Sequence, residues 1–73
     1  MVDNKFVLNI SRMTDEELLE YLVGEAEARA IYIYHNDPIT DEEWIKIDAR
    51  TDKIETIKAE ILRRMWYGRY NYV

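Results

Sequence analysis

The chain has 73 residues, no Cys and one His, with 48% hydrophobic residues and a formal net charge of −5. This length allows one small domain with a thin core, and the absence of Cys excludes disulfides and thiolate metal sites as added stabilisation. The negative charge argues against direct binding to nucleic acid or to an anionic membrane. A partner subunit is the remaining way to stabilise so small a domain, so we expect residues 1–73 to form one domain that homodimerises.

The first segment, residues 1–12, has a strand-like pattern. Phe6, Leu8 and Ile10 occupy alternate positions, as side chains on one face of a strand do. We expect a short extended arm that pairs with the C-terminal tail or with a second subunit. The segment lacks the basic-then-apolar pattern of a secretory signal, and no apolar run is long enough to span a bilayer. We therefore expect a soluble, cytoplasmic protein.

The letters MTDEEL at residues 13–18 predict the start of a helix. Thr14 is a good N-cap, and Glu17 can return a hydrogen bond to the N–H of that cap, which completes a capping box. The spacing of the apolar residues that follow predicts a helix over residues 15–36, within the segment 13–36. Residues 30–34, AIYIY, also have strong strand character, so helix and strand both remain open for them.

Nearly the same letters, ITDEEW, return at residues 39–44. Pro38 ends the first helix, because the residue before a proline avoids the α region, and this leaves a link over residues 37–40. A second capping box, from Thr40 to Glu43, predicts a helix over residues 41–67. Gly68 stands where a C′ glycine would end that helix, followed by a tail over residues 68–73.

These elements predict an all-α fold, an antiparallel helical hairpin. The short link makes the two helices fold back on each other. Two helices cannot bury all the apolar side chains they carry, so we expect two hairpins to pack as a four-helix bundle. The side chains expected in the core and in the dimer seam are Leu19, Leu22, Ala26, Ile33, Trp44, Ile47, Ile54, Ile57, Ile61 and Met65.

Charge is distributed unevenly along the chain. Residues 14–43 hold ten acidic residues and one Arg, whereas residues 61–73 hold three Arg and no acidic residue. In the hairpin, the acidic start of the first helix lies next to these arginines, and the opposite end stays negative. A basic protein surface is the natural partner for such an end. The acidic side chains expected to bind it are Asp37, Asp41, Glu42, Glu43, Glu25 and Glu27.

The profile, very short, acidic and helical, resembles the small host-modifying proteins encoded by bacteriophages and plasmids. That resemblance implies an inhibitor that occupies a basic, nucleic-acid-binding surface of a host protein by charge mimicry, in the host cytoplasm. The alternative is a structural or assembly role in which the apolar seam is the working surface. Both alternatives make the protein a binding partner rather than an enzyme.

One fragment resembles an enzyme family. Residues 16–20 read EExxE, as in the all-α nucleoside triphosphate pyrophosphohydrolases of the MazG and dimeric dUTPase type, and the resemblance implies carboxylates that hold Mg²⁺ over phosphates. The second family element, ExxD, does not occur, because Asp52 and Glu55 stand in reversed order. Ser11 and His35 are the only Ser and His, and neither has a catalytic context. We therefore expect no enzymatic activity, no cofactor and no metal.

Overall fold

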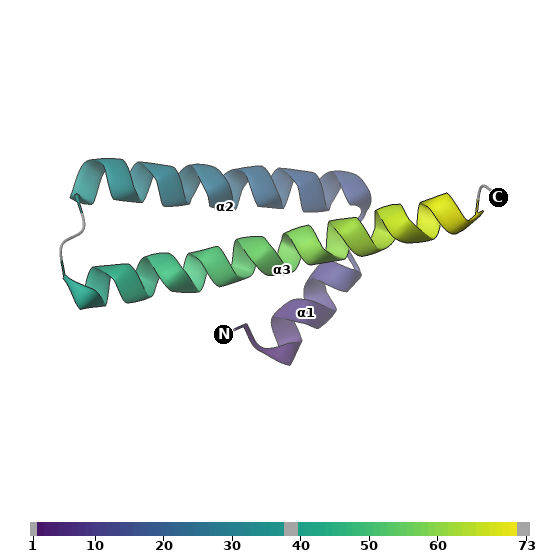
Figure 1. The fold of residues 1–73 in the computed structure, drawn as a ribbon, viewed down its shortest axis with the longest axis horizontal. Coiled ribbons are helices and arrows are strands. Elements are labelled where there is room, and N and C mark those ends of the chain that lie inside the picture. Colours follow the sequence, from purple (N-terminus) through teal and green to yellow (C-terminus); the bar gives the residue numbers. More distant parts are fainter. Residues whose placement is uncertain (1, 38–39, 72–73) are drawn as a thin grey trace.

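The computed structural model contains three helices and describes residues 2–37 and 40–71 (Figure 1). They are α1 over Asn4–Ser11, α2 over Asp15–Asn36 and α3 over Asp41–Asn71. The described residues contain no strand, which confirms the expected all-α class. Helices α2 and α3 lie side by side and run in opposite directions, and α1 packs across α3.

The extended arm expected over residues 1–12 is wrong, because residues 4–11 form α1. The carboxylate of Asp3 accepts a hydrogen bond from the N–H of Phe6 at 2.8 Å and so caps the start of the helix. Phe6 and Ile10 lie one helical turn apart and both pack into the core, while Leu8 points to solvent. Burial of this helical pair outweighs the local strand pattern.

Helix α2 begins and ends where the sequence predicted. Thr14 Oγ1 accepts from the N–H of Glu17 at 3.1 Å, and Glu17 Oε1 accepts from the N–H of Thr14 at 2.9 Å, so the capping box is complete. The backbone N–H of Thr14, followed by its side-chain hydroxyl, lowers the pKa of Glu17 by hydrogen bonding to its carboxylate. Residues 30–34 are helical. Asp37 follows with a left-handed backbone, φ 42°, and its N–H bonds the Ile33 carbonyl at 3.1 Å.

Helix α3 begins at the predicted residue but extends further than predicted. The N–H of Glu43 donates to Thr40 Oγ1 at 3.2 Å, as expected of the cap. The helix then continues to Asn71, past the end predicted at residue 67, because a glycine in a helix costs only about 1 kcal/mol. Residues 72 and 73 of the expected tail lie outside the described residues. None of the helices, as far as they are described, has an apolar stretch that would bridge a lipid bilayer.

The core is small and lies where the three helices meet. Among the described residues, the fully buried apolar side chains are Ile10, Leu18, Ile47 and Ile57. Phe6 of α1 sets its ring edge-on against Tyr21 of α2, with ring centroids 6.1 Å apart, and burial raises the pKa of Tyr21. Helix α1 therefore covers one side of the α2–α3 pair.

Candidate functional site

The guanidinium of Arg64 ties the three helices together near the start of α2. Its Nη1 donates to Asp15 Oδ1 and its Nε to Glu60 Oε2, both at 2.8 Å. Its Nη2 donates to the carbonyl oxygens of Ile10 and Ser11 at 3.3 and 3.2 Å. Carbonyls in the last turn of a helix lack partners within the helix, so Arg64 caps the end of α1. This junction holds α1 on one side of α3.

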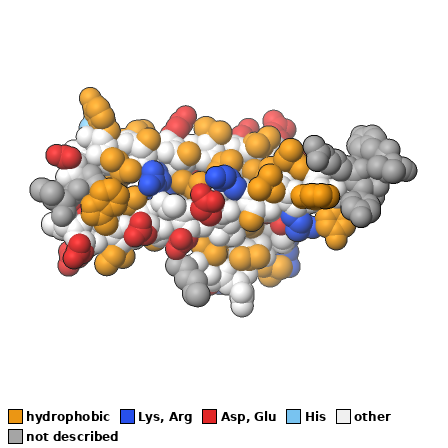
Figure 2. Space-filling view, viewed as in Figure 1, with side chains coloured by type: hydrophobic (Ala, Val, Ile, Leu, Met, Phe, Trp, Pro, Cys, Tyr) orange, Lys and Arg blue, Asp and Glu red, His pale blue; other side chains and the backbone are white. Residues whose placement is uncertain are grey.

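The opposite side of the α2–α3 pair is apolar and uncovered. Helix α1 packs against Ile57, whereas Trp44, Leu62 and Trp66 recur at helical spacing on a different side of α3. We call this side the apolar face. Its side chains and their exposed fractions are Leu19 (52%) and Val23 (54%) of α2 with Trp44 (44%), Leu62 (56%), Met65 (61%) and Trp66 (64%) of α3. Figure 2 shows hydrophobic side chains spread along the length of the molecule, with charged side chains among them.

Part of the apolar face is hollowed. Leu19 of α2 and Met65 of α3 line a hollow of about 300 Å³ together with Ile61, Asp15 and Arg64. Because the hollow opens between two exposed apolar side chains, a protruding apolar side chain of another molecule would fit into it.

The ten side chains expected in the core and dimer seam fall into three classes of burial. Those that are buried are Ile47 and Ile57. Those that are half-buried are Leu22, Ile33, Ile54 and Ile61. Those that remain exposed are Leu19, Ala26, Trp44 and Met65. The sequence analysis missed Ile10 and Leu18 as core residues, although the spacing of Phe6 and Ile10 after a possible Asp3 cap was a usable signal.

The six acidic side chains expected to bind a basic partner do not form one patch. Four lie where α2 ends and α3 begins: Asp37, Asp41, Glu42 and Glu43. Glu25 lies about three turns before the end of α2, and its carboxylate pairs with Arg50 at 2.8 Å with only 15% of its side chain exposed. Glu27, two residues further, is exposed on another side of α2. Of the six expected residues, only these four therefore share one surface, at one end of the α2–α3 pair, which we call the acidic end.

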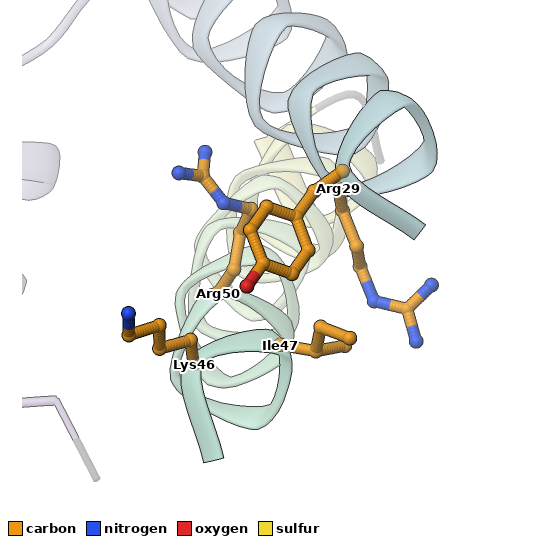
Figure 3. Close-up of a pocket in the computed structure, with 5 residues that line it drawn as sticks. Arg29, Lys46, Ile47 and Arg50 are labelled. Carbon is orange, nitrogen blue, oxygen red and sulfur yellow. The ribbon is translucent and has the colours of Figure 1, made fainter. Parts of the chain in front are cut away.

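The sequence analysis also missed a basic cleft between α2 and α3. The cleft has a volume of about 240 Å³ and is lined by Arg29, Tyr32, Lys46, Ile47 and Arg50. Arg29 Nε donates to Thr51 Oγ1 at 2.8 Å. In Figure 3, Arg29 points to one side of the pair, and Arg50 and Lys46 point to the other. Because these cations diverge, the cleft does not concentrate positive charge at one point.

The residues considered for chemistry make local structural contacts. Glu17 of the EExxE fragment completes the capping box of α2. Ser11 Oγ donates to the Leu8 carbonyl at 2.7 Å, and the ring of His35 lies edge-on to Tyr34. Within residues 2–37 and 40–71, no three His, Asp or Glu side chains are placed to hold a metal ion.

Comparison with protein-family models, with curated protein sequences and with solved structures gave no match. The surfaces of the described residues that are open to another molecule include the apolar face, the acidic end and the basic cleft.

Proposed function

We propose that this protein is an assembly module that acts by protein–protein interaction through its apolar face. The observation that carries the proposal is the exposure of six large apolar side chains on the side of α2 and α3 that α1 leaves uncovered. Together they expose on the order of 600 Å². This area is at the upper end of the largest apolar patch that a typical monomer exposes, and such patches often mark binding sites.

The thin core points to the same role. Only a few of the described side chains are buried. Covering the apolar face would therefore add substantially to the apolar area that is removed from water. At about 25 cal/mol per Å², this burial is worth on the order of 10 kcal/mol per copy before the costs of association. In the arrangement we propose, two α2–α3 pairs pack face to face as a four-helix bundle, and α1 lies on the outside of each pair.

The mass of the protein in solution tests this proposal. Sedimentation velocity should give a species heavier than the 8.8 kDa monomer for the unmodified chain. Leu62→Glu with Trp66→Glu should return the monomer with unchanged helical circular dichroism, because both side chains are exposed in the single chain. Ile45→Glu is the matched control, since Ile45 is exposed but lies on another side of α3. If the double variant has the same mass in solution as the unmodified chain, the proposal is refuted.

A second candidate function is binding of a basic protein surface by the acidic end, as a phage- or plasmid-type inhibitor would do. It is supported by Asp37, Asp41 and Glu42, which are exposed and lack ion pairs to the described Lys and Arg residues. Their negative field would attract a nucleic-acid-binding groove of a host protein. This partner would bind the acidic end and not the apolar face, so the second candidate has a separate test.

Charge reversal tests the second candidate. A partner captured from host lysate at low salt should be lost at high salt and also lost with Asp41→Lys and Glu42→Lys. Glu16→Lys with Glu20→Lys is the matched control, because it makes the same change of net charge in the exposed first turns of α2. Equal capture by both double variants would show that the acidic end does not bind.

A further inference from the structure

We infer that the occupant of the apolar face is a second copy of this chain, packed antiparallel about a two-fold axis near Glu55. The inference rests on the proposed assembly function and names its partner and orientation. Four observations support it: the symmetric placement of Trp44 and Trp66 along α3, the charges between them, the charges at the two ends of the molecule, and the apolar area that the face exposes.

The two Trp residues of α3 are placed symmetrically about Glu55. The chain has two Trp residues, and Trp44 and Trp66 each lie eleven residues from Glu55. Eleven residues make about three turns, so all three side chains share one side of the helix. A two-fold axis at Glu55 therefore lays the Trp44 region of one copy over the Leu62–Trp66 region of the other.

The charges between Trp44 and Trp66 favour the antiparallel orientation. Glu55 and Lys58 are exposed neighbours, with 3.4 Å between Lys58 Nζ and Glu55 Oε1 in one copy. In an antiparallel pair about this axis, the two Glu55 carboxylates meet at the axis. Lys58 of each copy then lies about one turn from Glu55 of the other copy and offsets the repulsion between the two carboxylates. In a parallel pair, Glu55 would face Glu55 and Lys58 would face Lys58, which is repulsive.

The two ends of the molecule favour the same orientation. A parallel pair would set two acidic ends side by side, with Asp37, Asp41 and Glu42 of both copies together. An antiparallel pair places the two acidic ends at opposite ends of the dimer and so removes this repulsion. It also opposes the dipoles of the two α3 helices.

The exposed area is sufficient for a dimer. The apolar face offers on the order of 600 Å² per copy, so two copies would bury roughly 1,200 Å². This is the lower limit of stable, specific interfaces. Glu55 and Lys58, at the centre of the face, are charged. The apolar contact therefore concentrates on either side of them, at Trp44 and at Leu62 to Trp66.

Distances between spin labels test the orientation. The chain has no Cys, so single variants Ile45→Cys and Ala59→Cys each carry one label, and both positions are exposed. An antiparallel dimer places the Ile45 labels about 30 Å or more apart and the Ala59 labels about 20 Å apart. A parallel dimer gives about 20 Å at both positions and would overturn the inferred orientation. If the unmodified chain is monomeric in solution, a second copy does not occupy the apolar face and the inference is wrong.

Mixing of charge variants tests the contact across the axis. Lys58→Glu and Glu55→Lys should each weaken self-association about tenfold, because like charges then face each other. A mixture of the two variants should recover the wild-type affinity as a heterodimer. If the mixture stays as weak as its components, Glu55 and Lys58 do not meet across the interface, and the inferred axis is wrong. If Leu62→Glu with Trp66→Glu abolishes the dimer while Lys58→Glu and Glu55→Lys leave it unchanged, the inferred axis is wrong but the proposed assembly function stands.

Discussion

Arg64 of α3 and Asp15 of α2 form an ion pair of 2.8 Å across 49 residues of sequence. The pair is asymmetric, because 84% of the Asp15 side chain is exposed but only 21% of the Arg64 side chain. An exposed ion pair by itself stabilises little. Its importance here comes from the other groups that the same guanidinium bonds, which are Glu60 and two carbonyl oxygens at the end of α1. The hydrogen bonds with Asp15 and Glu60 raise the pKa of Arg64.

Replacing Arg64 should release α1. In Arg64→Ala the Ser11 carbonyl loses the guanidinium and the Ile10 carbonyl keeps only backbone donors, so we expect the thermal midpoint to fall by more than about 5 °C. Hydrogen exchange should accelerate most in residues 4–11. Arg63→Ala is the matched control, because the guanidinium of Arg63 donates to Glu60 and lies over the ring of Tyr67, both within α3. Equal destabilisation by the two variants would show that capping of α1 is unimportant.

Shortening Ile57 should be costly. Its side chain is fully buried between α1, α2 and α3, and Ile57→Ala leaves a cavity at the centre of the core. We expect a loss of about 2–5 kcal/mol in the free energy of unfolding, measured by urea denaturation. Ile45→Ala removes the same atoms at a position that is 66% exposed, and it should change stability by less than about 1 kcal/mol. If Ile57→Ala and Ile45→Ala lower the free energy of unfolding by similar amounts, Ile57 does not lie in the core.

Stability should fall between pH 5 and pH 2 in a way that depends on Glu60. The hydrogen bond from Arg63, aided by Arg64, lowers the pKa of Glu60 from 4.5 to about 2. A carboxylate with a lowered pKa stabilises the fold fully above its unfolded pKa and loses that contribution as the pH falls through the folded pKa. After solvent screening, we expect on the order of 1 kcal/mol. Glu60→Gln should therefore be less stable than the wild type at pH 7, and the difference should shrink by pH 2.5 in thermal unfolding.

Gly24→Ala should stabilise the protein. Gly24 lies inside α2, and a Cβ added there meets no atom within 4 Å. Alanine in a helix interior is favoured over glycine by about 0.5–1 kcal/mol because it restricts the unfolded chain. Urea denaturation at neutral pH measures the gain. A loss of stability would mean that another molecule packs closely against Gly24, since the single chain leaves this position open.

The sequence by itself determined the helix ends that rely on short-range hydrogen bonds. The capping box from Thr14 to Glu17 and the Thr40 cap join groups three residues apart, and both helices begin where these residues predict. The Gly68 signal failed because a helix tolerates one glycine when nothing forces it to end. Short-range signals therefore predicted both ends of α2 and the start of α3, but not the C-terminal end of α3.

Only the tertiary structure decided where α1 lies and which surfaces stay open. Residues 4–11 alternate like a strand, yet they form a helix because Ile10 can then pack on Ile57 and Leu18. Glu25, expected on an acidic surface, lies half-buried against Arg50, which lies 25 residues further along the chain. Burial and ion pairing depend on which helix sides meet, and that is a property of the whole packing. For this reason the apolar face became visible only once α1 was seen to cover the opposite side of α2 and α3.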